Sequence, residues 1–123
     1  MDEAGMRARA SEELAKTSDQ KLKRALENYL VAPRPCLLDW DYGHIHLEFS
    51  EPRYPGFIVA EFPDSGTGIA FSEYGFGPDY PWGLIWLKQP GYGMDSGWFR
   101  SLDAAFRESM AWDEPAPPGY EVE

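Results

Sequence analysis

The residues best suited to metal chemistry are His44, His46 and Glu48. Alternate residues of a β-strand project on the same side, so on a strand these two imidazoles and one carboxylate stand in a row. Such a row can form part of a zinc site, which would make the protein a small metal-dependent enzyme. The chain has only 2 His, so any further ligand would have to be a carboxylate or Cys36. We therefore favour polar residues on an exposed strand face, and we expect no metal and no other cofactor.

Five carboxylates on or near the predicted strands offer the paired acids that a glycosidase uses. They are Asp39, Asp41, Glu48, Glu61 and Glu73. Strand alternation places several of them on the polar face of the sheet and not in a cleft. A carboxylate in open water is a poor general acid at neutral pH. We therefore expect a charged face that keeps the sheet soluble or docks a partner, and we do not expect an enzyme.

Cys36 is the only cysteine of the chain. A nucleophilic thiol needs a neighbouring histidine or cation, whereas we expect Cys36 on the apolar side of its strand, beside Leu38 and Trp40, as a structural thiol. One cysteine allows no intramolecular disulfide, which favours a reducing compartment. The first residues lack the basic and apolar regions of a signal peptide, and no apolar run approaches the ~20 residues of a membrane span. We expect a cytoplasmic protein.

Aromatic residues gather in the Gly-rich segments of the second half of the chain. The glycines within 76–78 and 91–93 lack the spacing of a phosphate-binding loop, so we interpret them as turn residues. Tyr80, Tyr92 and Trp98, with Asp95 between the last two, are typical of a protein-recognition surface. A second interpretation, which the sequence leaves open, is that these rings fill the open end of a sheet.

The periodicity predicts one α+β domain over residues 1–112 and an extended, Pro-rich tail at 113–123. We expect a helix over 19–31, ended by Pro33 and Pro35, after a looser arm at 1–17 that can be helical. A second helix should begin after Ser101, a predicted N-cap, and end near residue 112. Strands are expected at 36–40, 44–49, 57–62, 68–74 and 82–87, with a further short one at 98–99. Short connections predict an antiparallel meander of about five strands, with the two helices on one face and the other face exposed and polar.

The formal net charge is −10, and it is unevenly distributed along the chain. Residues 1–31 carry equal numbers of acidic and basic side chains, so the whole surplus belongs to residues 32–123. Such a surface repels phosphate backbones, which argues against a nucleic-acid partner. It attracts a basic protein, which is the partner that we expect.

The segment from Trp98 to Phe106, W-F-R-S-L-D-A-A-F, follows a predicted meander and a Gly-rich loop. In this order it resembles the end of the small acidic immunity proteins that are encoded beside bacterial polymorphic toxins. The resemblance implies a protein that binds a toxin and occludes its active site. It transfers no role to any individual residue.

These patterns together predict a protein-binding module, with an immunity protein as the specific hypothesis. The residues predicted to contact the partner are Asp39, Asp41, Glu48, Glu61, Glu73, Tyr80, Tyr92, Asp95 and Trp98. A rival hypothesis is a type III secretion chaperone, although those proteins usually carry a helix between their strand groups and none is predicted between 62 and 82. Two further hypotheses are the metal-dependent enzyme using His44 and His46, and a mimic of DNA whose carboxylates are spaced like phosphates.

Overall fold

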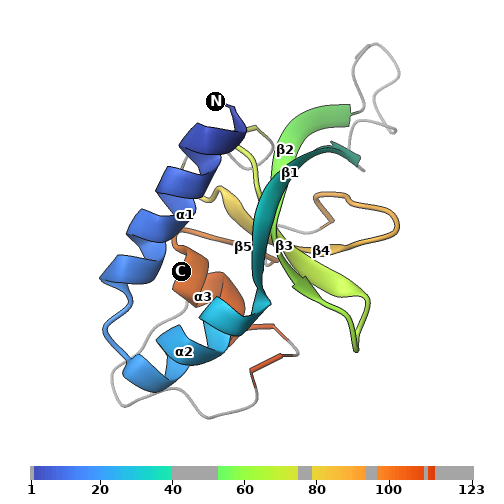
Figure 1. Cartoon of the computed structure of the whole chain (residues 1–123). Helices are drawn as coiled ribbons and strands as arrows, with labels where there is room; N and C mark the ends of the chain where they lie inside the picture. The colour runs from blue at the N-terminus through green and yellow to red at the C-terminus, as the bar shows by residue number, and fades with distance from the viewer. Residues whose placement is uncertain (1, 40–52, 75–78, 94–96, 110, 113–123) are drawn as a thin grey trace.

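A computed structural model of the chain describes residues 2–39, 53–74, 79–93, 97–109 and 111–112. Its elements are α1 (Glu3–Lys16), α2 (Gln20–Tyr29), β1 (Leu30–Asp39), β2 (Arg53–Phe62), β3 (Thr67–Phe71), β4 (Trp82–Trp86), β5 (Trp98–Phe99) and α3 (Leu102–Arg107). The strands form one sheet in the order β1-β2-β3-β4-β5, and each strand is antiparallel to the next. All three helices lie on one side of this sheet (Figure 1). The predicted α+β class and antiparallel meander are therefore confirmed.

Each helix begins at a side chain that accepts hydrogen bonds from its first turn. Asp2 accepts from the N–H of Gly5, and Asp19 accepts from two N–H groups at the start of α2. Ser101 accepts from the N–H of Ala104, which confirms its prediction as the N-cap of the last helix. These side chains satisfy backbone donors that have no partner inside the helix. The arm that was expected before residue 19 is helix α1. None of the described helices is long and apolar enough to cross a membrane.

The prolines expected to end the first long helix lie inside strand β1. The helix ends at Tyr29, and the strand begins immediately at Leu30 and contains both Pro33 and Pro35. A strand at the edge of a sheet tolerates proline where the N–H would point away from its neighbour. The N–H of Asp39 points outward in this way, because it donates to the carbonyl oxygen of Pro90 at 3.1 Å and not to β2. Alternate residues of a regular strand share this direction, so Pro35 occupies an outward position and costs no pairing with β2, while Pro33 lies where the register between Leu30 and Arg34 shifts.

The strand membership also differs from the prediction. The strand expected at 44–49 and the turn before it lie outside the described residues, and β1 pairs instead with β2. The fifth strand of the sheet is the short β5, which was expected only as an addition. The turn between β2 and β3 contains Gly66 at φ +70°, a conformation that favours glycine.

The larger part of the core lies between the helices and the sheet. Leu22 and Leu26 of α2 meet Phe62, which also contacts the ring of Tyr29 at 5.1 Å between centroids. The ring centroid of Phe106 in α3 lies 5.9 Å from that of Phe62, on the same side of the sheet. Each helix therefore buries one apolar stripe against the same sheet face, as an amphipathic helix requires.

The opposite face of the sheet was expected to be exposed and polar, and this prediction is wrong. It carries a second apolar cluster of buried residues. They are Leu38, Ile58, Ala70, Ile85, Tyr92 and Trp98. Residues of the connection from β4 to β5 lie on this face, and we call residues 88–93 and 97 of it the strap. The strap reaches β1, where the N–H of Tyr92 donates to the carbonyl oxygen of Asp39 at 2.9 Å. An outer sheet face need not be polar when a long connection covers it.

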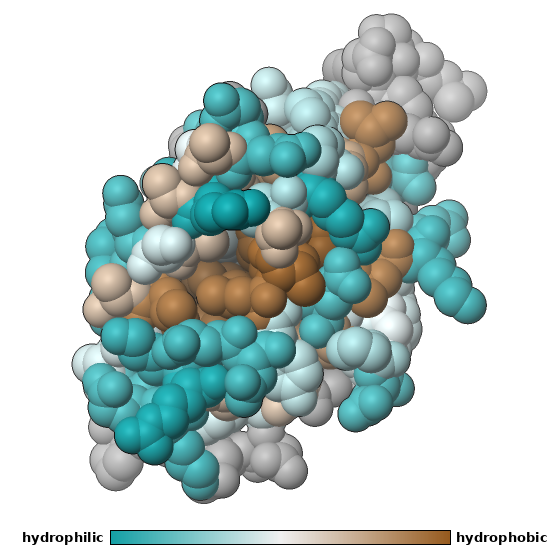
Figure 2. Space-filling view, viewed as in Figure 1, coloured by the Kyte–Doolittle hydropathy of each residue, from teal (hydrophilic) through white to brown (hydrophobic). Residues whose placement is uncertain are grey.

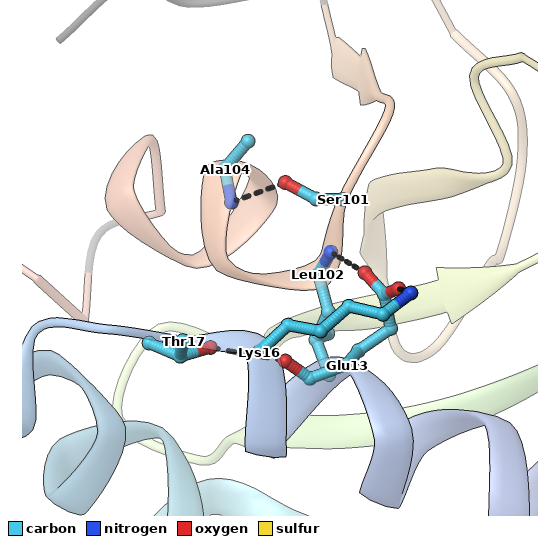
Figure 3. A network of polar contacts seen from close by, with 6 residues as sticks. All are labelled: Glu13, Lys16, Thr17, Ser101, Leu102 and Ala104. Atoms are coloured by element: carbon cyan, nitrogen blue, oxygen red, sulfur yellow. Dashed lines mark hydrogen bonds and ion pairs between the residues drawn. The ribbon is translucent and has the colours of Figure 1, made fainter.

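A buried carboxylate joins the first helix to the last. Glu13 of α1 is only 8% exposed, and its Oε1 accepts the backbone N–H of Leu102 at 3.1 Å, where α3 begins (Figure 3). Its Oε2 lies 3.5 Å from Nζ of Lys16, and its carbonyl oxygen accepts the hydroxyl of Thr17 at 3.1 Å. A negative charge at a helix N-terminus also interacts favourably with the helix dipole. This contact sets α3 against α1 across 89 residues of sequence.

Candidate partner-binding site

The predicted contact residues do not form one surface among the described residues. Asp41, Glu48 and Asp95 lie outside the described ranges, together with the histidine pair at 44 and 46. Glu73 is exposed, whereas Tyr80 is half-buried. The remaining predicted residues each have a partner within the fold; they are Asp39, Glu61, Tyr92 and Trp98.

Glu61 is paired with a cation on the neighbouring strand. Its Oε2 lies 2.9 Å from Nη2 of Arg34 and accepts a hydrogen bond from Nε of the same guanidinium at 3.1 Å. An exposed pair of this kind contributes little to stability. It does cancel most of the field of Glu61 at a distance, so this residue is a poor candidate for steering a basic partner.

Tyr92 and Trp98 were predicted to face a partner, but the structure buries both at 1% exposure. Nε1 of Trp98 donates to the carbonyl oxygen of Tyr92 at 2.7 Å, and the hydroxyl of Tyr92 lies 2.8 Å from that of Ser72. The ring of Trp98 lies directly over Gly83 of β4, where the absence of a Cβ leaves room for it. The second interpretation of the aromatics, that they fill the sheet, therefore describes these two rings correctly.

Tyr80 is held by Arg100. The guanidinium donates to the Tyr80 hydroxyl at 3.1 Å, and its Cζ lies 5.1 Å from the ring centroid. The tyrosine also packs against the second apolar cluster. It is thus a partly buried ring fixed by a cation, and only part of it is available to another molecule.

A groove lies between β4 and the strap, with a volume of about 550 Å³. Trp86, at the end of β4, stands at this groove and is 62% exposed. Its other lining residues include Asp39 and Leu84 from the sheet, and Lys88 and Gly93 from the strap. An exposed tryptophan beside a concave surface is a common feature of protein-binding sites.

Sequence reasoning missed Trp86, although the sequence contains a signal for it. Trp82, Leu84 and Trp86 alternate along β4 and so share one face of the sheet. The first two pack in the main core, but the third lies beyond it. A tryptophan near the end of a predicted strand is therefore a candidate for exposure, while the strand interior is not.

The edge of β4 beside the groove carries backbone groups that are directed away from β3. The N–H of Leu87 donates to Gly66 on the β3 side, so the alternate residues Leu84 and Trp86 direct their N–H and C=O groups away from β3. β5 pairs with β4 only at Trp82 and Gly83. Within the described part of the chain, no strand lies beside Leu84 and Trp86 on that side.

The buried ionisable groups near this face are poor nucleophiles at neutral pH. Burial raises the pKa of the Cys36 thiol to about 11, although the charge of Arg34 acts in the opposite direction. Burial also raises the pKa of Tyr92 to about 12, against the hydrogen bond from Ser72. Both groups hold their protons at neutral pH, and a protonated thiol does not attack a substrate efficiently. Among residues within the described ranges, no group of three His, Cys, Asp or Glu side chains is arranged to hold a metal ion.

Charge is divided unequally between the described residues and the rest of the chain. The described residues carry 13 acidic and 11 basic side chains. The remaining 8 acidic residues, with no Lys or Arg among them, belong to 40–52, 94–96 and 113–123. The first of these segments follows Asp39 directly, and the second stands between Gly93 and Gly97, so two of the three continue from residues that line the groove.

No protein-family model, no curated protein and no solved structure matches this chain. The resemblance to immunity proteins therefore stays a prediction.

Proposed function

We propose that this protein is a protein-binding module that holds a basic partner protein at the groove between β4 and the strap. The observation that carries the proposal is Trp86, a large ring left 62% exposed at the edge of that groove. Tryptophan is among the residues that most often dominate binding energy, and its truncation at such a position commonly costs about 2 kcal/mol or more.

The rest of the described fold supports binding more than catalysis. Its helices are capped, its strap is anchored through two buried rings, and the thiol and phenol nearest the groove face are protonated at neutral pH. The strap is held in place by these contacts before a partner arrives, which reduces the entropy lost on binding. The net charge of −10 favours a partner of positive charge.

An immunity protein that occludes the active site of a bacterial toxin is the specific role that we propose. A small acidic protein with a preformed recognition groove suits this role, because a toxin that acts on nucleic acid carries a basic site. The binding of an acidic inhibitor to such a site is fast and depends on salt.

The test uses the purified full chain and the product of the adjacent gene. Wild-type protein should form a one-to-one complex by calorimetry and suppress the activity of that product. Trp86→Ala should weaken the complex by at least tenfold, or about 1.4 kcal/mol, without lowering the midpoint of thermal unfolding. Leu37→Ala is the matched control, because Leu37 is a 56% exposed apolar residue on the opposite edge of the sheet.

Two results would contradict the proposal. Equal affinities for wild type and Trp86→Ala would remove the groove from the interface. Turnover of a small molecule, with no protein partner found among neighbouring gene products or in the native cell extract, would reject the binding function itself.

A further inference from the structure

We infer that α1 and α3 open and close together as one unit on the helix-covered side of the sheet, while the strands stay paired. We call these two helices the latch. Two carboxylates near the junction between α1 and α2, those of Glu13 and Asp19, hold α3 at its first and last residues. The latch lies on the opposite side of the sheet from the strap, so its opening does not depend on the proposed function (Figure 1).

Helix α3 is too short to persist without contacts from the rest of the chain. It has six residues, Leu102–Arg107, whereas isolated helices below roughly 12 residues are marginal in water. Leu102, Ala105 and Phe106 are fully buried, so the helix is held by packing and by the side chains that meet its two ends. The state of α3 therefore follows the state of its neighbours.

Glu13 couples the first residue of α3 to α1. Its Oε1 accepts the N–H of Leu102 at 3.1 Å, and the residue is 8% exposed (Figure 3). The carbonyl oxygen of Glu13 accepts the hydroxyl of Thr17, which is also buried, at 3.1 Å. If α3 opened alone, it would take the Leu102 donor away from a buried carboxylate, which costs free energy. If both helices open, both groups reach water, so this contact favours joint opening.

Asp19 couples the last residue of α3 to the start of α2. Its Oδ2 lies 3.4 Å from Nη2 of Arg107, whose side chain is only 7% exposed. The other oxygen, Oδ1, accepts the N–H groups of Lys21 and Leu22 and so caps α2. Asp19 thus fixes the closed position of α3 relative to α2, as Glu13 fixes it relative to α1.

The packing of α1 allows it to move with α3. The large apolar side chain that α1 buries is Met6, and its other buried residues are Ala10 and Glu13. A hollow of about 340 Å³ lies between α1 and the start of β1, and apolar side chains gather at the surface there in Figure 2. A hollow provides fewer dispersion contacts than close packing does. The sheet keeps its strand pairing and the second apolar cluster on its other face when the latch opens.

Native-state hydrogen exchange of the isotope-labelled full chain, followed by NMR, tests the latch. The amides of Ala10 and Ala105 report on α1 and α3, and the amide of Ala70 reports on the central strand β3. In mild denaturant we expect Ala10 and Ala105 to exchange through the same opening. That opening should be at least about tenfold more populated than the one that exposes Ala70.

The variant Asp2→Ala distinguishes joint opening from separate opening. Asp2 is exposed and caps α1 at the opposite end from the hydrogen bond to α3, where it accepts the N–H of Gly5 at 2.8 Å. The loss of an N-cap should make opening of the helix roughly fivefold more frequent. We expect this increase at Ala105 as well as at Ala10, with the exchange of Ala70 unchanged.

Two further variants serve as controls. Glu12→Ala removes an exposed carboxylate of α1 next to Glu13 and should leave the exchange of Ala105 unchanged. Glu13→Ala removes the contact between the two helices. In that background Asp2→Ala should still accelerate exchange in α1, but it should accelerate the exchange of Ala105 much less than it does in the wild type.

Faster exchange confined to α1 in Asp2→Ala would show that the two helices open separately, and the latch would be refuted. Equal acceleration at Ala10, Ala105 and Ala70 would show that only the whole domain opens, which is also incompatible with a latch. An undiminished effect of Asp2→Ala on Ala105 in the Glu13→Ala background would overturn the role assigned to the Glu13 contact.

Discussion

The close packing of Trp98 on Gly83 predicts that Gly83→Ala loosens the strap. A Cβ on Gly83 would lie 2.3 Å from Cε2 of Trp98 and within 2.5 Å of two further ring atoms. No pair of carbon atoms tolerates such a separation, so the ring must move. The ring is 1% exposed and its Nε1 is bonded to the Tyr92 carbonyl, so movement displaces core neighbours and breaks that hydrogen bond.

The expected loss combines two costs. Excess volume in a packed core costs about 1–3 kcal/mol, and an intramolecular hydrogen bond contributes about 1 kcal/mol. Gly83→Ala should therefore lower the free energy of unfolding by about 2–4 kcal/mol. In urea this corresponds to a midpoint lower by roughly 1–2 M.

Equilibrium unfolding in urea measures the stability, and near-ultraviolet circular dichroism reports the packing of the tryptophans. Gly97→Ala is the control, since a Cβ there meets no atom within 4 Å and the backbone is not in the left-handed region. That variant should match wild type or gain up to about 1 kcal/mol through a less flexible unfolded chain. A Gly83→Ala protein within about 0.5 kcal/mol of wild type, with an unchanged near-ultraviolet spectrum, would refute this packing of Trp98.

Three further predictions concern other parts of the fold. Glu13→Ala should cost about 1–3 kcal/mol in urea unfolding, because the Leu102 N–H loses its acceptor, whereas Glu13→Gln keeps an acceptor and should cost less. The free energy of unfolding should fall as pH rises above 9.0, because the unfolded chain ionises Cys36 there, whereas the folded chain holds its pKa at about 11. Cys36→Ala should make that fall less steep. An unchanged slope would contradict the burial of the thiol. Trp86→Ala should leave the unfolding midpoint unchanged, and a marked loss of stability would show that this ring belongs to the core.

Local sequence patterns were sufficient to predict the start of the last helix and the antiparallel order of the strands. Ser101 was predicted as an N-cap because a serine followed by an amphipathic stripe satisfies the first turn, and the structure has it in that position. The antiparallel order followed from short connections, which cannot join parallel strands. Neither conclusion needed knowledge of distant residues.

The prolines at 33 and 35 show where local patterns were insufficient. A proline ends a helix and is also tolerated in an edge strand, so the residue itself does not distinguish a loop from β1. Only the pairing of β1 with β2, and the outward direction of its odd-numbered residues, decided the outcome.

By itself, the sequence determined the class of fold, the N-cap Ser101 and the size and sign of the charge, because each follows from residue type and short-range spacing. Only the tertiary structure decided which aromatic rings are available to a partner. Tyr92 and Trp98 are buried because the strap folds back across the sheet, while Trp86 is exposed because β4 extends beyond the main core. Burial depends on neighbours brought together by chain crossings, and residue type carries no information about those neighbours.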